Sequence, residues 1–296
     1  VVLYEYDWRK DPYDIANELN AYINDNCGRV IFVSHSMGGL VSSYYLAKGS
    51  AQRARVIKHI SLGTPYLGSE QISYIMMTGE VFQDYKDFIT ADPVNIIWNL
   101  NSSYGLLPTR QHFRPYMNYG YFQGDFYITK GRYNSYEDTI TAMSQKCSNW
   151  NNALAQTTIA NQAKLFTSTG AHITSLVESY YIIGDGELTA QEVTMFSFLE
   201  LEFDFREATL SNKTKDGDGT VTIHSATING NTDPNKTYYT YDLTHNELSG
   251  HSDEEEKQSA TDKLLDFINV IIHNQADSLT ATTLVSAYNM YKTRQP

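Results

Sequence analysis

Residues 29–45 read RVIFVSHSMGGLVSSYY, and this stretch decides the fold. Its first part, Val30–Val33, is a short run of β-branched and aromatic side chains, as a buried strand requires. Its second part carries apolar or aromatic residues at helical spacing, namely Leu40, Val41, Tyr44 and Tyr45. The stretch therefore predicts a buried strand that turns directly into a helix.

The turn between these two elements contains Ser36, followed two positions later by Gly38. Such a strand–turn–helix is typical of a nucleophile elbow, which exposes the serine hydroxyl at the carboxyl end of the strand. The N–H of Met37 would then lie at the helix N-terminus, where an oxyanion is stabilised. Ser34 stands where the usual motif has glycine, and its side chain is small enough for strand and helix to approach closely. The alternative is a chance Ser-x-Gly in a glycine-rich turn.

The composition is that of a globular protein. The chain has 296 residues, enough to bury a full core, and 41% of them are hydrophobic. Its net charge of −12 argues against nucleic acid and anionic membranes as partners. Two cysteines are too few for a disulfide framework or a thiolate zinc site. Because no run of about 18 apolar residues occurs, we expect no transmembrane segment and at most a peripheral lipid contact. The many Tyr, Asn, Thr and Ser residues favour an exported protein, on composition alone.

Strands and helices alternate along the first part of the chain. Val1–Tyr6 has the pattern of a strand, and an amphipathic helix with apolar residues at 3.6 periodicity follows from Pro12 to Ile23. Val56–Ser61 is predicted to be another strand after the Ser36 helix. This order indicates an α/β fold with a mostly parallel sheet covered on both faces.

The alternation stops at about residue 70 and resumes near residue 165. We therefore expect residues 1–69 to form the first part of the core, 70–164 an inserted cap or lid, and 165–296 the second part of the core. The cap is rich in aromatic residues that could face an apolar pocket: Tyr74, Phe82, Tyr85, Phe88, Trp98, Tyr104, Phe113 and Tyr116. Later elements are expected as helices at 151–166 and 259–273, strands at 180–184, 195–205 and 237–243, and a helical tail from Ala276.

A nucleophilic serine needs a base held by a third group, and in α/β-hydrolases these follow in the order Ser, acid, His. His245 and His251 both lie after the 237–243 strand and before the last helix, as this order requires. We favour His251, because Gly250 allows a tight loop before it and the acidic residues after it resemble a first helical turn. His245 is the alternative base.

The segment Lys215–Val221, KDGDGTV, supplies the acid. Its glycines let the backbone bend so that Asp218 can point at an imidazole, while Asp216 and Asp185 are weaker candidates. A calcium loop is the rival interpretation, but Thr227 stands where that loop needs a bidentate glutamate. We predict no metal and no cofactor.

Several motifs together resemble the lecithin:cholesterol acyltransferase-like family of α/β-hydrolases. They are YDWR at 6–9, SHSMGGL at 34–40, SLGTPYLGS at 61–69, LLP at 106–108 and DGTV at 218–221. The resemblance implies a catalytic triad of Ser36, Asp218 and His251, and lipid-type acyl esters as substrates. It also implies that the YDWR segment, with Trp8, is structural or lines the acyl site. Tyr66 and Leu67 are further candidates for binding the substrate.

In this fold the second oxyanion N–H comes from the loop after the third strand. The resemblance places that strand between Val1–Tyr6 and Val30–Val33, where the chain offers none. We therefore expect the sequence to be a fragment of a longer protein, and the alternative is a rearranged sheet.

The leading functional hypothesis is a serine esterase or lipase that acts through an acyl-enzyme on Ser36, with transfer to an acceptor alcohol as a variant. The alternative from another class is a non-catalytic binding module that kept the hydrolase scaffold.

Overall fold

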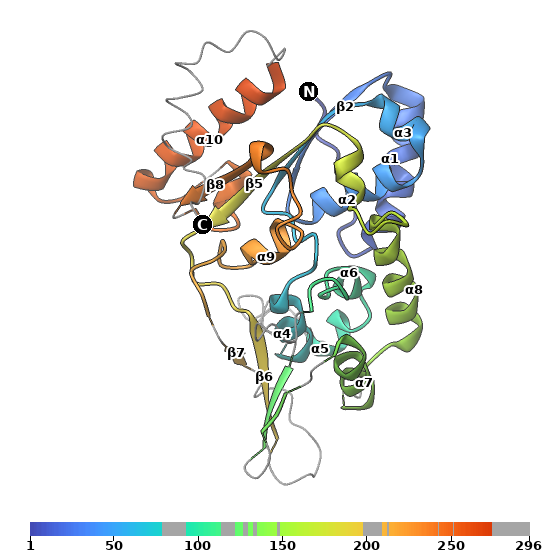
Figure 1. Ribbon diagram of the computed structural model, residues 1–296, viewed down its shortest axis with the longest axis vertical. Coiled ribbons are helices and arrows are strands. Elements are labelled where there is room, and N and C mark those ends of the chain that lie inside the picture. Colours follow the sequence, from blue (N-terminus) through green and yellow to red (C-terminus); the bar gives the residue numbers. More distant parts are fainter. Residues whose placement is uncertain are drawn as a thin grey trace.

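The structure is a computed structural model that describes residues 1–78, 93–113, 122–126, 130–132, 135–146, 149–197, 209–211, 213–241, 243–250 and 252–273. Figure 1 shows an upper and a lower part, with α2 (Met37–Ala47), the helix that follows Ser36, in the upper one. All statements below concern the described residues. The expected tail helix from Ala276 lies outside them.

The upper part is built on a sheet of four parallel strands in the order β1-β2-β5-β8. Their bounds are Val30–His35 for β1, Val56–Leu62 for β2, Ser179–Asp185 for β5 and Thr237–Tyr241 for β8. The predicted α/β class with a mostly parallel sheet is confirmed. Strands β2 and β5 are buried along most of their length, as expected for the central strands of a sheet covered by helices.

Two hydrophobic clusters lie on opposite faces of this sheet, and the helices that belong to them lie on opposite sides of the strands in Figure 1. Tyr181 and Ile183 of β5 face the cluster that contains α1 (Pro12–Asn26) and α2 (Met37–Ala47). Ile182, between them, faces the cluster that contains α10 (Glu255–His273). Because side chains alternate along a strand, this one-residue switch shows that the sheet is buried on both faces.

Helix α1 starts as its sequence predicts. The Asp11 carboxylate caps the helix by accepting a hydrogen bond of 2.8 Å from the N–H of Tyr13, and Pro12 occupies the first turn. The apolar stripe Ile15, Ala16, Leu19 and Ile23 is buried in the cluster that α1 shares with α2. The other helical elements of the described chain are α3 (Ser50–Arg55), α4 (Glu70–Thr78), α5 (Pro93–Ile97), α6 (Asn101–Gly105), α7 (Tyr136–Lys146), α8 (Asn152–Gln162) and α9 (Ile223–Ala226), with the 3-10 turns Ala163–Leu165, Ile173–Leu176, Pro234–Lys236 and Glu247–Ser249.

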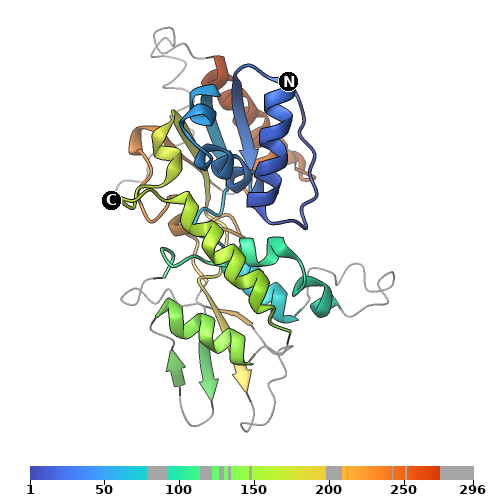
Figure 2. The same cartoon turned by 90° about the vertical axis from the view of Figure 1, so that its right-hand side faces the viewer.

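A second sheet lies at the far end of the molecule from α10 (Figures 1 and 2). Its order is β4-β3-β6-β7, with β4 at Lys130–Arg132, β3 at Phe122–Phe126, β6 at Glu192–Ser197 and β7 at Thr209–Ser211. Strand β6 pairs with β3 in parallel, so segments from both sides of residue 165 build one sheet. The strand expected at 195–205 thus begins earlier and joins the elements of 70–164 instead of standing apart.

The prediction of a strand at Val1–Tyr6 is wrong. No described strand pairs with these residues, and β1 pairs with β2 on one side only. A groove of about 730 Å³ lies between Val1–Tyr6 and β1, so the two backbones do not meet. A strand needs a neighbouring backbone to which it can form hydrogen bonds, and this segment has none among the described strands. Its alternating side chains pack on a helical cluster instead, since Tyr4 and Tyr6 contact the α1–α2 cluster.

No helix within the described ranges is both long and apolar enough to cross a membrane.

Candidate active site

Ser36 sits at the sharp turn between β1 and α2, as the sequence predicts for an elbow. Its φ of 53° and ψ of −127° lie outside the regions that non-glycine residues normally adopt. The turn is held because the Ser36 N–H donates a hydrogen bond of 2.9 Å to the carbonyl of Leu62 in the neighbouring strand. This strained backbone directs the Ser36 side chain away from the sheet, at the carboxyl end of β1.

Small residues make this turn possible. A Cβ atom on Gly39 would overlap the side chain of Thr64, so the helix can approach the end of β2 only with glycine there. A Cβ on Gly38 would lie 3.9 Å from the Cβ of Ser34, an ordinary contact. Serine in place of the usual glycine at position 34 is therefore accommodated without displacing the helix.

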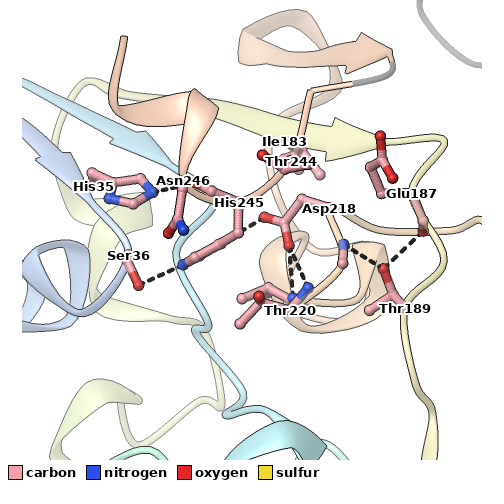
Figure 3. Close-up of polar contacts among 12 residues, drawn as sticks. His35, Ser36, Ile183, Glu187, Thr189, Asp218, Thr220, Thr244, His245 and Asn246 are labelled. Atoms are coloured by element: carbon pink, nitrogen blue, oxygen red, sulfur yellow. Dashed lines mark hydrogen bonds and ion pairs between the residues drawn. The ribbon is translucent and has the colours of Figure 1, made fainter. Parts of the chain in front are cut away.

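The Ser36 hydroxyl contacts His245, and His245 contacts Asp218 (Figure 3). The Nε2 atom of His245 lies 2.7 Å from Ser36 Oγ, and its Nδ1 atom lies 2.8 Å from Asp218 Oδ2. A carboxylate can only accept, so Nδ1 carries the proton and Nε2 is free to accept one from the serine hydroxyl. This arrangement can draw a proton from Ser36 as its oxygen attacks an electrophile.

Asp218 is almost completely buried, with 1% of its surface exposed. Its Oδ1 atom accepts the N–H groups of Thr220 at 3.0 Å and Val221 at 2.7 Å, which leaves Oδ2 for His245. A Cβ on Gly63, at the end of β2, would lie 2.9 Å from Oδ2 and 3.2 Å from His245 Nδ1. Glycine at 63 therefore provides the room in which acid and imidazole meet.

Thr189 supports the turn that carries Asp218, and the sequence analysis did not identify it. Its hydroxyl oxygen accepts the N–H of Gly219 at 2.8 Å and donates to the carbonyl of Glu187 at 3.0 Å. Thr189 comes from a stretch with little likeness to the family motifs, so no motif pointed to it.

The prediction of His251 as the partner of Ser36 is wrong in its geometry, because His245 holds that place. His245 follows β8 after a short connection, and its N–H donates a 2.7 Å hydrogen bond to the carbonyl of Asp218. Gly250, which favoured His251, has another role: with φ at 97° it turns the chain onto α10, and an added Cβ would lie 2.8 Å from Leu265. Position 251 itself lies outside the described residues.

Asp218, and not either of the other acid candidates, holds the place beside His245 Nδ1. Asp185 ends β5, and Asp216 accepts the N–H of Ile223 through its backbone carbonyl. In the same loop both carboxylate oxygens of Asp218 accept hydrogen bonds, which favours the role of acid over the calcium interpretation. Within the described part of the chain, no group of three or more His, Cys, Asp or Glu side chains is placed to hold a metal ion.

A cavity of about 360 Å³ opens beside Ser36 and Met37. Met37 is the first residue of α2, so its N–H has no partner within the helix. The cavity walls are mostly aliphatic: Ile72 and Ile75 of α4, Ile97 of α5, Leu100 and Leu106. Tyr6 and Trp8 contribute from the N-terminal segment. The size and the apolar lining are those of a small-molecule pocket.

Tyr66 and Leu67, expected as candidates for substrate binding, do not line this cavity. Both are buried in the α1–α2 cluster, and the ring of Tyr66 packs edge-on against His172 and Tyr181. A hydrogen bond to α9 holds the backbone of the turn that carries them: the N–H of Leu67 donates to Ser225 Oγ at 3.1 Å. Their position indicates a role in packing.

Those aromatic residues of the expected cap that the structure describes pack against one another and do not face Ser36 as predicted. Trp98 and Tyr104 are buried in a separate cluster with Trp150, and Tyr74 and Phe113 pack against the same cluster. Phe82, Tyr85, Phe88 and Tyr116 lie outside the described residues. The described aromatics therefore form a small core of their own, and aliphatic residues face the serine.

Comparison with known proteins places these features in a family. The model of the lecithin:cholesterol acyltransferase family matches residues 1–192 of the 296. No curated protein sequence matches the chain. Among solved structures, one chain of the crystal structure of the Tle4–Tli4 complex aligns with a TM-score of 0.54 and 14% identity, over 90% of this chain and 67% of that one. At this identity the likeness shows a shared fold. The family match covers both strand β1 with the Ser36 elbow and the segment that lines the cavity, and the chain belongs to the lecithin:cholesterol acyltransferase family of α/β-hydrolase proteins.

Proposed function

We propose that this protein cleaves or transfers the acyl groups of lipid-like carboxylic esters through an acyl-enzyme on Ser36. One observation carries the proposal: Ser36 Oγ, His245 and Asp218 form a continuous hydrogen-bonded chain that opens into an apolar cavity. Membership of the family supports an enzyme that acts on lipid esters. Ser36 is then the nucleophile, His245 the general base and acid, and Asp218 the group that orients the imidazole.

The first half of the reaction forms the acyl-enzyme. As Ser36 Oγ bonds to the ester carbonyl carbon, its proton passes to His245 Nε2 and the carbonyl oxygen becomes an oxyanion. The unpartnered N–H of Met37 supplies one donor to this oxyanion. When the ester C–O bond breaks, His245 returns the proton to the departing alcohol. Asp218 stays ionised and stabilises the imidazolium in between.

The second half removes the acyl group. Water, or an acceptor alcohol, gives a proton to His245 as its oxygen attacks the acyl carbon, and Ser36 Oγ regains the proton when it leaves. Hydrolysis and transfer differ only in which oxygen nucleophile reaches the acyl-enzyme. We favour hydrolysis, and the ratio of free acid to new ester formed in the presence of a soluble alcohol measures the balance.

The aliphatic walls of the cavity favour the acyl chain as the part of the substrate bound there. Ile72, Ile75, Ile97 and Leu100 come from the segment 70–164, which we propose acts as a cap over Ser36. An acyl chain buries apolar surface in such a site at roughly 25 cal/mol per Å², so longer chains gain affinity until the cavity is full.

A fluorophosphonate probe tests the proposal, because it reacts with an activated serine and not with an idle one. We expect labelling of the protein at Ser36, found by peptide mass spectrometry, and loss of labelling in Ser36→Ala. Ser34→Ala is the matched control, since Ser34 lies two residues away in β1 and lines the groove beside Val1–Tyr6 instead of the cavity beside Ser36. A folded protein that stays unlabelled would favour the binding-module alternative.

A further inference from the structure

His35, the residue directly before Ser36, contacts the backbone of the proposed base. Its Nε2 atom lies 2.7 Å from the carbonyl oxygen of His245, and the two imidazole rings are 4.8 Å apart (Figure 3). A carbonyl oxygen only accepts hydrogen bonds, so His35 is the donor and carries its proton on Nε2. The contact joins β1 to the loop after β8, which are far apart in the sequence.

At neutral pH this donor is an uncharged imidazole. Burial, followed by the proximity of His245, lowers the pKa of His35 to about 4. The nearby carboxylate of Asp218 has the opposite and smaller effect on this pKa. His35 therefore acts on its neighbour through one directed hydrogen bond, and adds no positive charge beside an imidazole that must itself take up a proton.

Hydrogen bonds hold both the N–H and the C=O group of His245. Its N–H donates to the carbonyl of Asp218 at 2.7 Å, and its C=O accepts from His35 at 2.7 Å. The two anchors are the proposed acid itself and the neighbour of the proposed nucleophile. A shift of the His245 backbone away from either partner lengthens one of these bonds.

We propose that His35 is a positioning residue for the reaction of Ser36, because its hydrogen bond to the His245 carbonyl sets the distance between His245 Nε2 and Ser36 Oγ. This inference rests on the proposed function and adds to it a residue outside the Ser–His–Asp chain. A small misplacement of a catalytic group costs up to about 10²-fold in rate. Because His35 also lines the cavity beside Ser36, loss of the anchor should slow the chemical step by more than it changes substrate binding.

Matched substitutions separate this role from packing. The amide nitrogen of a glutamine reaches about as far as Nε2 of histidine, whereas that of asparagine is shorter by one methylene. We expect His35→Gln to keep kcat within a few-fold of the unchanged protein. His35→Asn and His35→Leu should lower kcat, and the rate of fluorophosphonate labelling, by about 10- to 100-fold, with a much smaller change in KM.

Labelling of the unchanged protein at Ser36 tests the proposed function first, so failure of that function can be told apart from failure of the positioning role. If that labelling succeeds, equal rates in the Gln and Asn variants would overturn the positioning role, as would a rise in KM with constant kcat. The Asn and Gln pair keeps the test decisive if the Leu variant fails to fold. A readout independent of turnover is the ¹⁵N spectrum of the histidines, in which His35 should be the Nε2–H tautomer. An Nδ1–H tautomer would also overturn the proposal.

Discussion

Glu70 Oε1 and His112 Nε2 lie 2.5 Å apart, and both side chains are almost completely excluded from solvent. Glu70 is the first residue of α4, the helix that brings Ile72 and Ile75 to the cavity beside Ser36. His112 follows α6, and its carbonyl accepts a hydrogen bond of 2.9 Å from Nε2 of His224, a residue of α9. The pair thus ties the wall of the cavity to two separate segments.

Removing one member of this pair should destabilise the fold strongly. His112→Ala leaves the Glu70 carboxylate buried without its partner, and such a loss typically costs about 3–5 kcal/mol. We expect that decrease in the free energy of unfolding, measured with urea. The double variant E70Q/H112A should recover a large part of it, because no carboxylate then remains buried. Strict additivity of the two single changes would contradict the account.

Two other buried histidines should make the fold sensitive to acid. Burial lowers the pKa of His59 to about 4, and burial followed by the proximity of His59 lowers the pKa of His172 to about 3. Between pH 6.5 and these values the unfolded chain binds protons that the folded chain does not. Stability is therefore fully present above about pH 6.5 and is lost as the pH falls, by on the order of 3 kcal/mol for His59 and about 5 kcal/mol for His172.

Urea unfolding at several pH values between 7 and 4 measures this loss. His59→Gln should reduce the slope of the free energy of unfolding against pH in this range by the equivalent of about one bound proton. His273→Gln is the matched control, since His273 is exposed at the end of α10, and it should leave the slope unchanged. A slope that is the same in both variants would contradict the role of His59.

Gly63→Ala should abolish most of the activity, because its new Cβ atom would collide with the proposed acid and base in addition to straining the backbone. The new Cβ would press on Asp218 Oδ2 and His245 Nδ1, at a position whose φ is 54°. Gly170→Ala is the matched control, because φ is 82° there and no atom lies within 4 Å of the new Cβ. Both variants should lose about 1–2 kcal/mol of stability from the left-handed backbone. Only Gly63→Ala should lose kcat on a short-chain ester, and equal kcat in both would contradict the argument.

Filling the cavity should change the preferred acyl chain. Ile75→Phe adds volume at a wall of the cavity next to Ser36, so long-chain p-nitrophenyl esters should lose kcat/KM by about tenfold or more while the acetate ester is unaffected. Leu176→Phe, at an exposed site outside the cavity, should leave the chain-length profile unchanged. An unchanged profile in Ile75→Phe would place the acyl chain elsewhere.

The sequence predicted the parts of the site that depend on local backbone chemistry. Ser36 and Met37 follow from the strand–turn–helix pattern, and Asp218 from a glycine-bracketed turn after a strand. The choice between His245 and His251 depends on the path of a loop, which is fixed by the long-range bonds of His245 to Asp218 and His35. Local pattern at Gly250 misled the prediction, because the packing partner of that glycine is Leu265 on the next helix.

Features that depend on tertiary pairing were also beyond the sequence. Val1–Tyr6 has the composition of a strand, yet only the presence of a neighbouring backbone decides whether it forms one. Trp98 and Tyr104 have the chemistry of a pocket lining, but they pack on Trp150 from a distant helix–loop junction. In both cases the residue types suit either structure, and the segment that packs against them in the fold determines which one forms.

The most direct measurement of the central claim compares the hydrolysis of a short-chain p-nitrophenyl ester by His245→Ala and His251→Ala. If His245 is the base that activates Ser36, His245→Ala should lose at least about 10²–10⁴-fold in kcat, the usual contribution of a general base, while both variants stay folded. His251→Ala should retain activity within a few-fold of the unchanged protein. Full activity in His245→Ala, with the loss appearing in His251→Ala instead, would contradict the account.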